Sequence, residues 1–100
     1  MRIEWSELSE RQLHDIFDYY SVEVNLKTAR KIVKRIIERV SILESNPLAG
    51  AKEELLSDYP EDYRYLVENN YKIIYWKKEN LITIASVFDC RQNPTKIKKI

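Results

Sequence analysis

The first residues of the chain change from an alternating to a helical pattern of apolar positions. Residues 2–5, RIEW, alternate polar and apolar side chains, which predicts a short β-strand. Apolar residues then recur at helical spacing: Leu13, Ile16, Phe17 and Tyr20. Either Ser6 or Ser9 can cap this helix, and Ser9 with Gln12 three residues later matches a capping box.

A second and longer helix is predicted after Asn25, a good N-terminal cap. Its apolar positions form one stripe with basic residues behind it: Leu26, Ala29, Ile32, Val33, Ile36, Ile37, Val40 and Leu43. The stripe is too short for a coiled coil, which favours packing against a core. In the segment SNPLAG, Pro47 cannot continue a helix and Gly50 tolerates a left-handed backbone. The two helices are therefore predicted to form an antiparallel hairpin.

After Pro60 the apolar period becomes two. Three strands follow, DYRYLVE at 62–68, YKIIYWK at 71–77 and LITIASVF at 81–88. They are separated by Asn69-Asn70, which suits a tight turn, and by Lys78-Glu79-Asn80. The prediction is one α+β domain over residues 1–100, in the order strand, helix, helix, strand, strand, strand. The helical hairpin covers one face of a small antiparallel sheet, which the first strand is free to join.

The last strand indicates which side chains face the helices. Its larger apolar set is expected to face them: Ile82, Ile84, Ser86 and Phe88. The alternate set is expected on an open face: Thr83, Ala85, Val87, Asp89 and Arg91. Arg91 would project from that face, where Arg64 and Lys72 could join it. The expected surface is concave, cationic and partly aromatic.

Composition narrows the class of protein. The chain has 44% apolar residues and a formal net charge of +1, so overall charge does not indicate a nucleic-acid binder. Cys90 is the only cysteine, which excludes an intrachain disulfide and favours a reducing cytoplasm. The N-terminal residues lack the apolar core of a signal peptide, and no apolar stretch is long enough to span a bilayer. A cytoplasmic protein without a membrane partner is expected.

Charge is nevertheless divided along the chain. Residues 27–39 carry six basic side chains against Glu38, residues 53–68 carry six acids around Arg64, and the tail from Arg91 has no acid. Such division is typical of solvated faces. Any polyanion would meet the second helix or the tail.

The sequence lacks the residues that several kinds of chemistry require. His14 is the only histidine and lies in the first helix as a surface residue, so no metal site or cofactor is expected. The single glycine rules out a glycine-rich phosphate loop. Cys90 is interpreted as a small apolar strand residue. Glu53 and Glu54 could supply a general base, although a solvated pair is favoured because nothing in the sequence buries them.

Two arginines are candidate site residues. Arg64 interrupts a strand of tyrosine and aliphatic residues, either because its face is open or because it pairs with Glu68 or an acid of the preceding loop. Arg91 and Gln92 end the last strand as planar donors that could bind phosphate or carboxylate. They could equally belong to a solvated turn begun by Asn93-Pro94. Both alternatives stay open for Arg64 and for the pair Arg91 and Gln92.

The segment YRYLVENNYKIIYWKKENLITIASVFDCRQNP, preceded by NPLAG, resembles the C-terminal half of the RelE/ParE superfamily of bacterial toxins. The family pattern runs from an Arg opening a strand, through an aromatic-flanked strand, to an apolar strand ending in Val-x-x-x-Arg. Arg64, residues 71–75, Val87 and Arg91 occupy those positions. The resemblance covers about Ile3 to Pro94 and implies the toxin of a type II toxin–antitoxin module.

That resemblance implies two possible mechanisms. RelE-like members are ribosome-dependent mRNA endonucleases, for which Arg64, Arg91 and Lys72 would be the catalytic candidates, with Lys52 a further cation. ParE-like members are associated with inhibition of DNA gyrase, for which Arg64, Arg91 and Gln92 would contact the target. Asp89, where many relatives carry His, would repel a phosphate and favours the ParE-like branch.

The resemblance also implies a partner. A cognate antitoxin is expected, with a tail that wraps the helical hairpin and the sheet. The alternatives are the mRNA endonuclease and a non-toxic binding module of the same fold.

Overall fold

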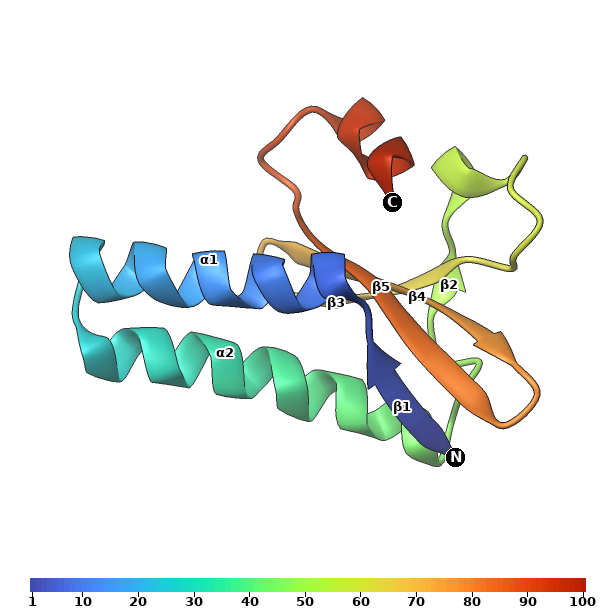
Figure 1. The fold of residues 1–100 in the computed structure, drawn as a ribbon, viewed down its shortest axis with the longest axis horizontal. Helices are drawn as coiled ribbons and strands as arrows, with labels where there is room; N and C mark the ends of the chain where they lie inside the picture. Colours follow the sequence, from blue (N-terminus) through green and yellow to red (C-terminus); the bar gives the residue numbers. More distant parts are fainter.

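The computed structural model describes all 100 residues as a helical hairpin packed on one side of a five-stranded sheet (Figure 1). In chain order the elements are β1 (Arg2–Trp5), α1 (Glu7–Glu23), α2 (Leu26–Ser41), the 3₁₀ turn η1 (Ile42–Glu44), β2 (Ala51–Lys52), η2 (Glu54–Leu56), β3 (Arg64–Glu68), β4 (Tyr71–Lys78), β5 (Leu81–Asp89) and η3 (Pro94–Lys99). None of the helices has both the length and the apolar composition needed to cross a membrane.

The sheet has the strand order β1-β5-β4-β3-β2. Strands β3, β4 and β5 form the predicted antiparallel meander, which confirms the α+β class. Two features were not predicted. β1 joins the sheet parallel to β5, so the sheet is mixed, and the two-residue strand β2 extends its other edge.

Side-chain caps define where the two helices begin. Asn25 caps α2 as predicted, its Oδ1 accepting the backbone N–H of Thr28 at 2.7 Å. For α1 the cap is Ser6, whose Oγ accepts the N–H of Ser9 at 3.1 Å, and the predicted Ser9–Gln12 box is wrong. Gln12 instead accepts the N–H of Val87 at 2.6 Å. Gln12 thereby provides an acceptor for a backbone N–H of β5 that lies beyond the end of its pairing with β1.

The main core lies between the hairpin and the sheet. Its buried members are Ile16, Ile36, Val40, Leu43, Leu66, Tyr71, Ile73, Tyr75, Ile82, Ile84 and Val87. The predicted stripe on α2 is only partly correct. Leu26 and Ile37 are 45% and 48% exposed and lie outside this core.

A β-bulge changes which side chains of β5 face the helices. Ile74 pairs with Ser86 but Tyr75 pairs with Ile84, so Ala85 is an extra residue in β5. The expected alternation therefore holds for Ile82 and Ile84 and is wrong beyond the bulge. Val87 faces the helices, while Phe88 lies in a second cluster on the other side.

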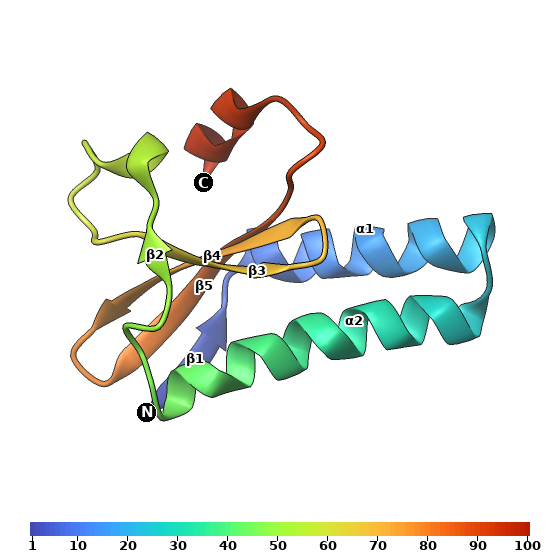
Figure 2. The same ribbon diagram turned by 180° about the vertical axis from the view of Figure 1, so that it is seen from behind.

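The second face of the sheet is covered rather than open. Leu56 of η2 and Ile97 of η3 pack there on Ile74 and Phe88, and Ile97 is 3% exposed. Figures 1 and 2 show η2 and η3 next to each other, away from the helical hairpin. The expected concave cationic surface is thus replaced by a small apolar core under the C-terminal segment.

Candidate functional site

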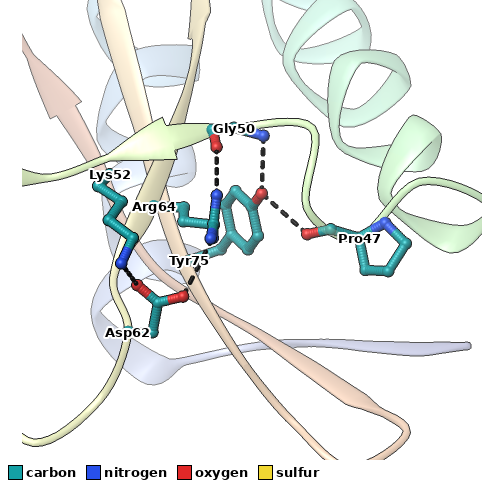
Figure 3. Close-up of polar contacts among 6 residues, drawn as sticks. All are labelled: Pro47, Gly50, Lys52, Asp62, Arg64 and Tyr75. Atoms are coloured by element: carbon teal, nitrogen blue, oxygen red, sulfur yellow. Dashed lines mark hydrogen bonds and ion pairs between the residues drawn. The ribbon is translucent and has the colours of Figure 1, made fainter.

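Arg64 fixes the turn after α2 to the sheet (Figure 3). Its Nη1 donates to the carbonyl of Gly50 at 3.1 Å, and its Nε contacts Oδ2 of Asp62 at 3.1 Å. Lys52 approaches the other oxygen of Asp62 at 3.8 Å. The ion pair expected with an acid of the preceding loop is therefore confirmed, with Asp62 as the partner and not Glu68. The Arg64 side chain is 20% exposed.

Tyr75 completes this arrangement from β4. Its hydroxyl accepts the N–H of Gly50 at 2.9 Å and donates to the carbonyl of Pro47 at 2.9 Å (Figure 3). Burial raises the pKa of the Tyr75 phenol, while the bond from Gly50 and the charge of Arg64 act in the opposite direction. Gly50 does not have a positive φ, so the left-handed backbone expected there is wrong. The position needs glycine because the chain passes too close to Tyr75 and Tyr65 for a Cβ.

Arg91 lies just beyond the end of β5 and binds Asp89. Its Nη2 is 2.8 Å from Oδ2 and its Nε is 3.0 Å from Oδ1. This pairing lowers the pKa of Asp89, with smaller contributions from the Arg91 backbone and from Asn70. Asp89 therefore neutralises the arginine. The hydroxyls of Tyr20 and Tyr71 are close enough to affect the pKa of Arg91, which places Arg91 on the helix side of the sheet.

Gln92 is exposed, and its backbone N–H donates to the carbonyl of Asp89 at 3.0 Å. Arg91 and Gln92 thus belong to a turn at the end of β5. The Arg91 side chain is 59% exposed. Both side chains are accessible to a binding partner.

Lys72 points to the opposite face of the sheet from Arg64. It is paired across the strands with Phe88 of the second cluster. Its Nζ binds Oε2 of Glu53 at 2.8 Å and lies 4.2 Å from the centre of the Tyr65 ring. Glu53 is buried, which corrects the expectation that both glutamates are solvated; only Glu54 is exposed.

The three predicted cations do not share one surface. Arg64 pairs with Tyr75, whereas Asp89 pairs with Tyr71, four residues earlier in β4. Arg64 and Asp89 are thus about 13 Å apart along the strands and about 10 Å apart across them. Lys72 lies on the other face, and each cation is paired with its own carboxylate. The expected cluster of Arg64, Lys72 and Arg91 is wrong.

The remaining candidates lie apart from these residues. His14 is on the surface of α1, as predicted. Cys90 is exposed in the turn after β5 and is not the apolar strand residue expected. No group of three His, Cys, Asp or Glu side chains is arranged to hold a metal ion.

The sequence did not indicate that Gly50, Arg64 and Tyr75 would contact one another. Gly50 is the only glycine of the chain, which was the available signal for a position where no side chain fits. The partner of that turn could not be identified without the register of β3 and β4.

Comparison with known proteins identifies the class of this fold. Residues 3–94 match the family described as ParE toxin of type II toxin-antitoxin system, parDE. The chain therefore belongs to the ParE toxin family, in the ParE-like branch of the RelE/ParE superfamily. No curated protein sequence is matched by the chain.

Solved structures of similar fold include the following two. A chain of the chromosomal ParDE system from P. aeruginosa is 26% identical with a TM-score of 0.74, over 89% of this chain and 95% of the other. A chain of the YoeB dimer from Staphylococcus aureus is 22% identical with a TM-score of 0.59, over 87% of this chain and 93% of the other. The second likeness concerns the fold alone.

Proposed function

We propose that the free chain inhibits growth by acting on DNA gyrase in the cytoplasm, and that it does not cleave mRNA. The observation that supports this choice is the separation of the cations. Cleavage of RNA by side chains alone needs several positive groups around one phosphate, because electrostatic stabilisation of the transition state is the largest contribution to catalysis. Arg64 and Arg91 lie at opposite ends of the meander and Lys72 lies on its other face.

Neutralisation of each cation supports the same choice. Asp62, Glu53 and Asp89 each lie within 3.1 Å of their basic partner. A phosphate would have to displace a carboxylate from each of them. Arg91 and Gln92 are instead proposed as target contacts, since both are accessible at the end of β5. Arg64 is proposed to support the target surface from within, through Gly50.

An antitoxin is proposed as the partner that neutralises the chain. Large apolar side chains are exposed where α1 joins α2: Tyr19 at 54%, Val22 at 82% and Val24 at 56%. Val67 on β3 is 50% exposed as well. Clustered apolar exposure favours a binding partner. Coexpression with the cognate antitoxin should yield a stable complex, and a chain that purifies alone from those cells would contradict the proposal.

The experiment that tests the mechanism pairs two assays on the purified chain. Wild-type chain is expected to inhibit gyrase supercoiling and to leave translated mRNA intact in primer extension. Arg91→Ala should weaken gyrase inhibition by about tenfold, because Arg91 is proposed as one of the few contact residues that carry most of the binding energy. Lys96→Ala is the matched control, as it removes an exposed cation from the tail.

Cleavage at codon-defined positions that disappears in Arg91→Ala, with supercoiling unaffected, would establish the endonuclease alternative. A chain with neither activity, and without growth arrest when expressed alone, would indicate the non-toxic binding module. Circular dichroism of Arg91→Ala must match the wild type, which is expected because Arg91 binds only the neighbouring Asp89.

A further inference from the structure

The α1–α2 hairpin carries an apolar groove between its two helices. The groove has a volume of about 560 Å³, and Leu13, Phe17 and Val33 form its apolar lining. Leu26 and Ile37 lie seven residues before and four residues after Val33, so they fall on the same face of α2. Both are close to half exposed. The apolar strip therefore runs along most of α2.

Figure 1 shows the joined ends of α1 and α2 projecting beyond the edge of the sheet. This part of the hairpin is free of the rest of the chain.

The two rims of the groove carry opposite charges. On α1 the rim consists of Glu10, His14 and Asp18. On α2 the strip is flanked by Arg30 and Lys34, which are exposed and lie one turn apart. The net charges of the two whole helices are also opposite in sign. α1 holds five acids against Arg11, and α2 holds six basic residues against Glu38.

We propose that this face of the hairpin pairs with the same face of a second copy of the chain, forming a four-helix bundle about a two-fold axis. A two-fold axis that runs along the groove, parallel to the helices, places α1 of each copy against α2 of the other. The acidic rim of one copy then meets the basic rim of its partner twice, while the apolar strips meet in the centre. One surface that carries both signs of charge on either side of an apolar strip is complementary to itself.

The size of the face sets the strength of the contact. Helices of this length are about 25 Å long and about 10 Å wide. Two of them side by side offer roughly 500 Å² per copy, or roughly 1,000 Å² in total, the lower limit for a specific interface. The dimer should therefore be reversible, with a dissociation constant on the order of 10–100 μM.

Sedimentation equilibrium of the purified chain from about 2 to about 300 μM tests the proposal across that range. The wild type should pass reversibly from monomer to dimer. Ile37→Ser should raise the dissociation constant about tenfold, since it removes one of the exposed apolar side chains of the strip that the second copy would cover. It should leave the fold intact, because Ile37 lies outside the core.

Charge exchange gives the sharper test. Asp18→Lys and Arg30→Glu should each weaken the dimer about fivefold, because each creates two repulsive contacts across the axis. The double variant should return to within about twofold of the wild type, since the exchanged rims again match. Asp15→Lys is the control. It makes the same charge change on α1 away from the groove and should have no effect.

Two results would overturn the proposal. One is a chain that remains monomeric at the highest concentration, which leaves the groove to a different protein. The other is a dimer that is insensitive to Ile37→Ser and to both rim reversals, which places the contact elsewhere.

Discussion

At Gly50 the backbone passes so close to the sheet that no side chain fits. A Cβ would lie 2.6 Å from the carbonyl oxygen of Tyr65 and 2.8 Å from the ring of Tyr75. This approach allows the Gly50 amide groups to reach Arg64 and the Tyr75 hydroxyl. One small residue thus permits the contacts that hold the turn after α2 against β3 and β4.

Gly50→Ala should lower the free energy of unfolding by about 1–3 kcal/mol, the usual cost of overpacking a buried site. The nearest obstacle is backbone, which cannot rotate away as a side chain would. Urea unfolding followed by circular dichroism measures the change. Ala49→Gly serves as the comparison variant, because Ala49 is adjacent to Gly50 and its side chain is exposed. A variant Gly50→Ala as stable as the wild type would mean that the turn can move away from the sheet.

The strands show what an element's sequence does and does not determine. The apolar periods predicted both helices, the three-strand meander and the turn at residues 69–70, because each depends on neighbouring residues. The bulge at Ala85 could not be predicted, since it depends on how β5 pairs with β4. One extra residue moved Val87 and Phe88 to faces opposite to those expected.

In the candidate site, too, contacts between residues close in sequence could be predicted, and contacts between distant residues could not. Asp62 precedes Arg64 by two residues, so their ion pair could be expected from the sequence. Lys72 and Glu53 are 19 residues apart and meet only because η2 returns over the sheet. The parallel pairing of β1 with β5 joins the two ends of the chain and leaves no local signal.

Glu79 is an unfavourable residue in the turn between β4 and β5. It has a φ of 56°, a left-handed conformation that costs a residue with a side chain about 1 kcal/mol. Glycine adopts this conformation without strain and favours such a hairpin position. Glu79→Gly should therefore raise the free energy of unfolding by about 0.5–1 kcal/mol. The matched variant Glu54→Gly, in η2 with a right-handed backbone, should be destabilised; the same sign for both would contradict this explanation.

Considered as a whole, the molecule has an apolar cluster on each side of one sheet. The second cluster depends on the last seven residues, where Ile97 is almost fully buried against the sheet. Polar support comes from Tyr59, whose hydroxyl donates to the backbone carbonyl of Lys98 at 2.8 Å. The C-terminal segment is thus part of the fold, although a solvated turn begun by Asn93-Pro94 was one of the two alternatives that the sequence left open.

Ile97→Ala should lower the free energy of unfolding by about 2 kcal/mol, at the lower end for a buried aliphatic residue because the chain end can adjust. Lys96→Ala, exposed one residue earlier, should change it by less than about 0.5 kcal/mol. Chemical unfolding of both variants provides the comparison. Equal stability of Ile97→Ala and the wild type would mean that the segment contributes little to the fold in solution.

Buried tyrosine side chains make the stability of the fold sensitive to alkaline pH. Burial raises the pKa of Tyr71 well above its ordinary value, and the hydrogen bond with Tyr20 adds to the shift. Burial also raises the pKa of Tyr75 and of Tyr63. In the unfolded chain these phenols ionise near pH 10. Above that pH the folded state binds more protons than the unfolded state, so stability is complete below pH 10 and falls as pH rises.

Each such phenol can contribute up to about 1.4 kcal/mol per pH unit to this loss. Tyr71→Phe removes one ionising group and keeps the apolar ring. The variant should therefore lose stability less steeply between about pH 10 and about pH 12, by roughly 1 kcal/mol per pH unit. Urea unfolding at several pH values measures the two slopes. Parallel slopes would show that Tyr71 is free to ionise in the folded chain, which its burial between α1 and the sheet should prevent.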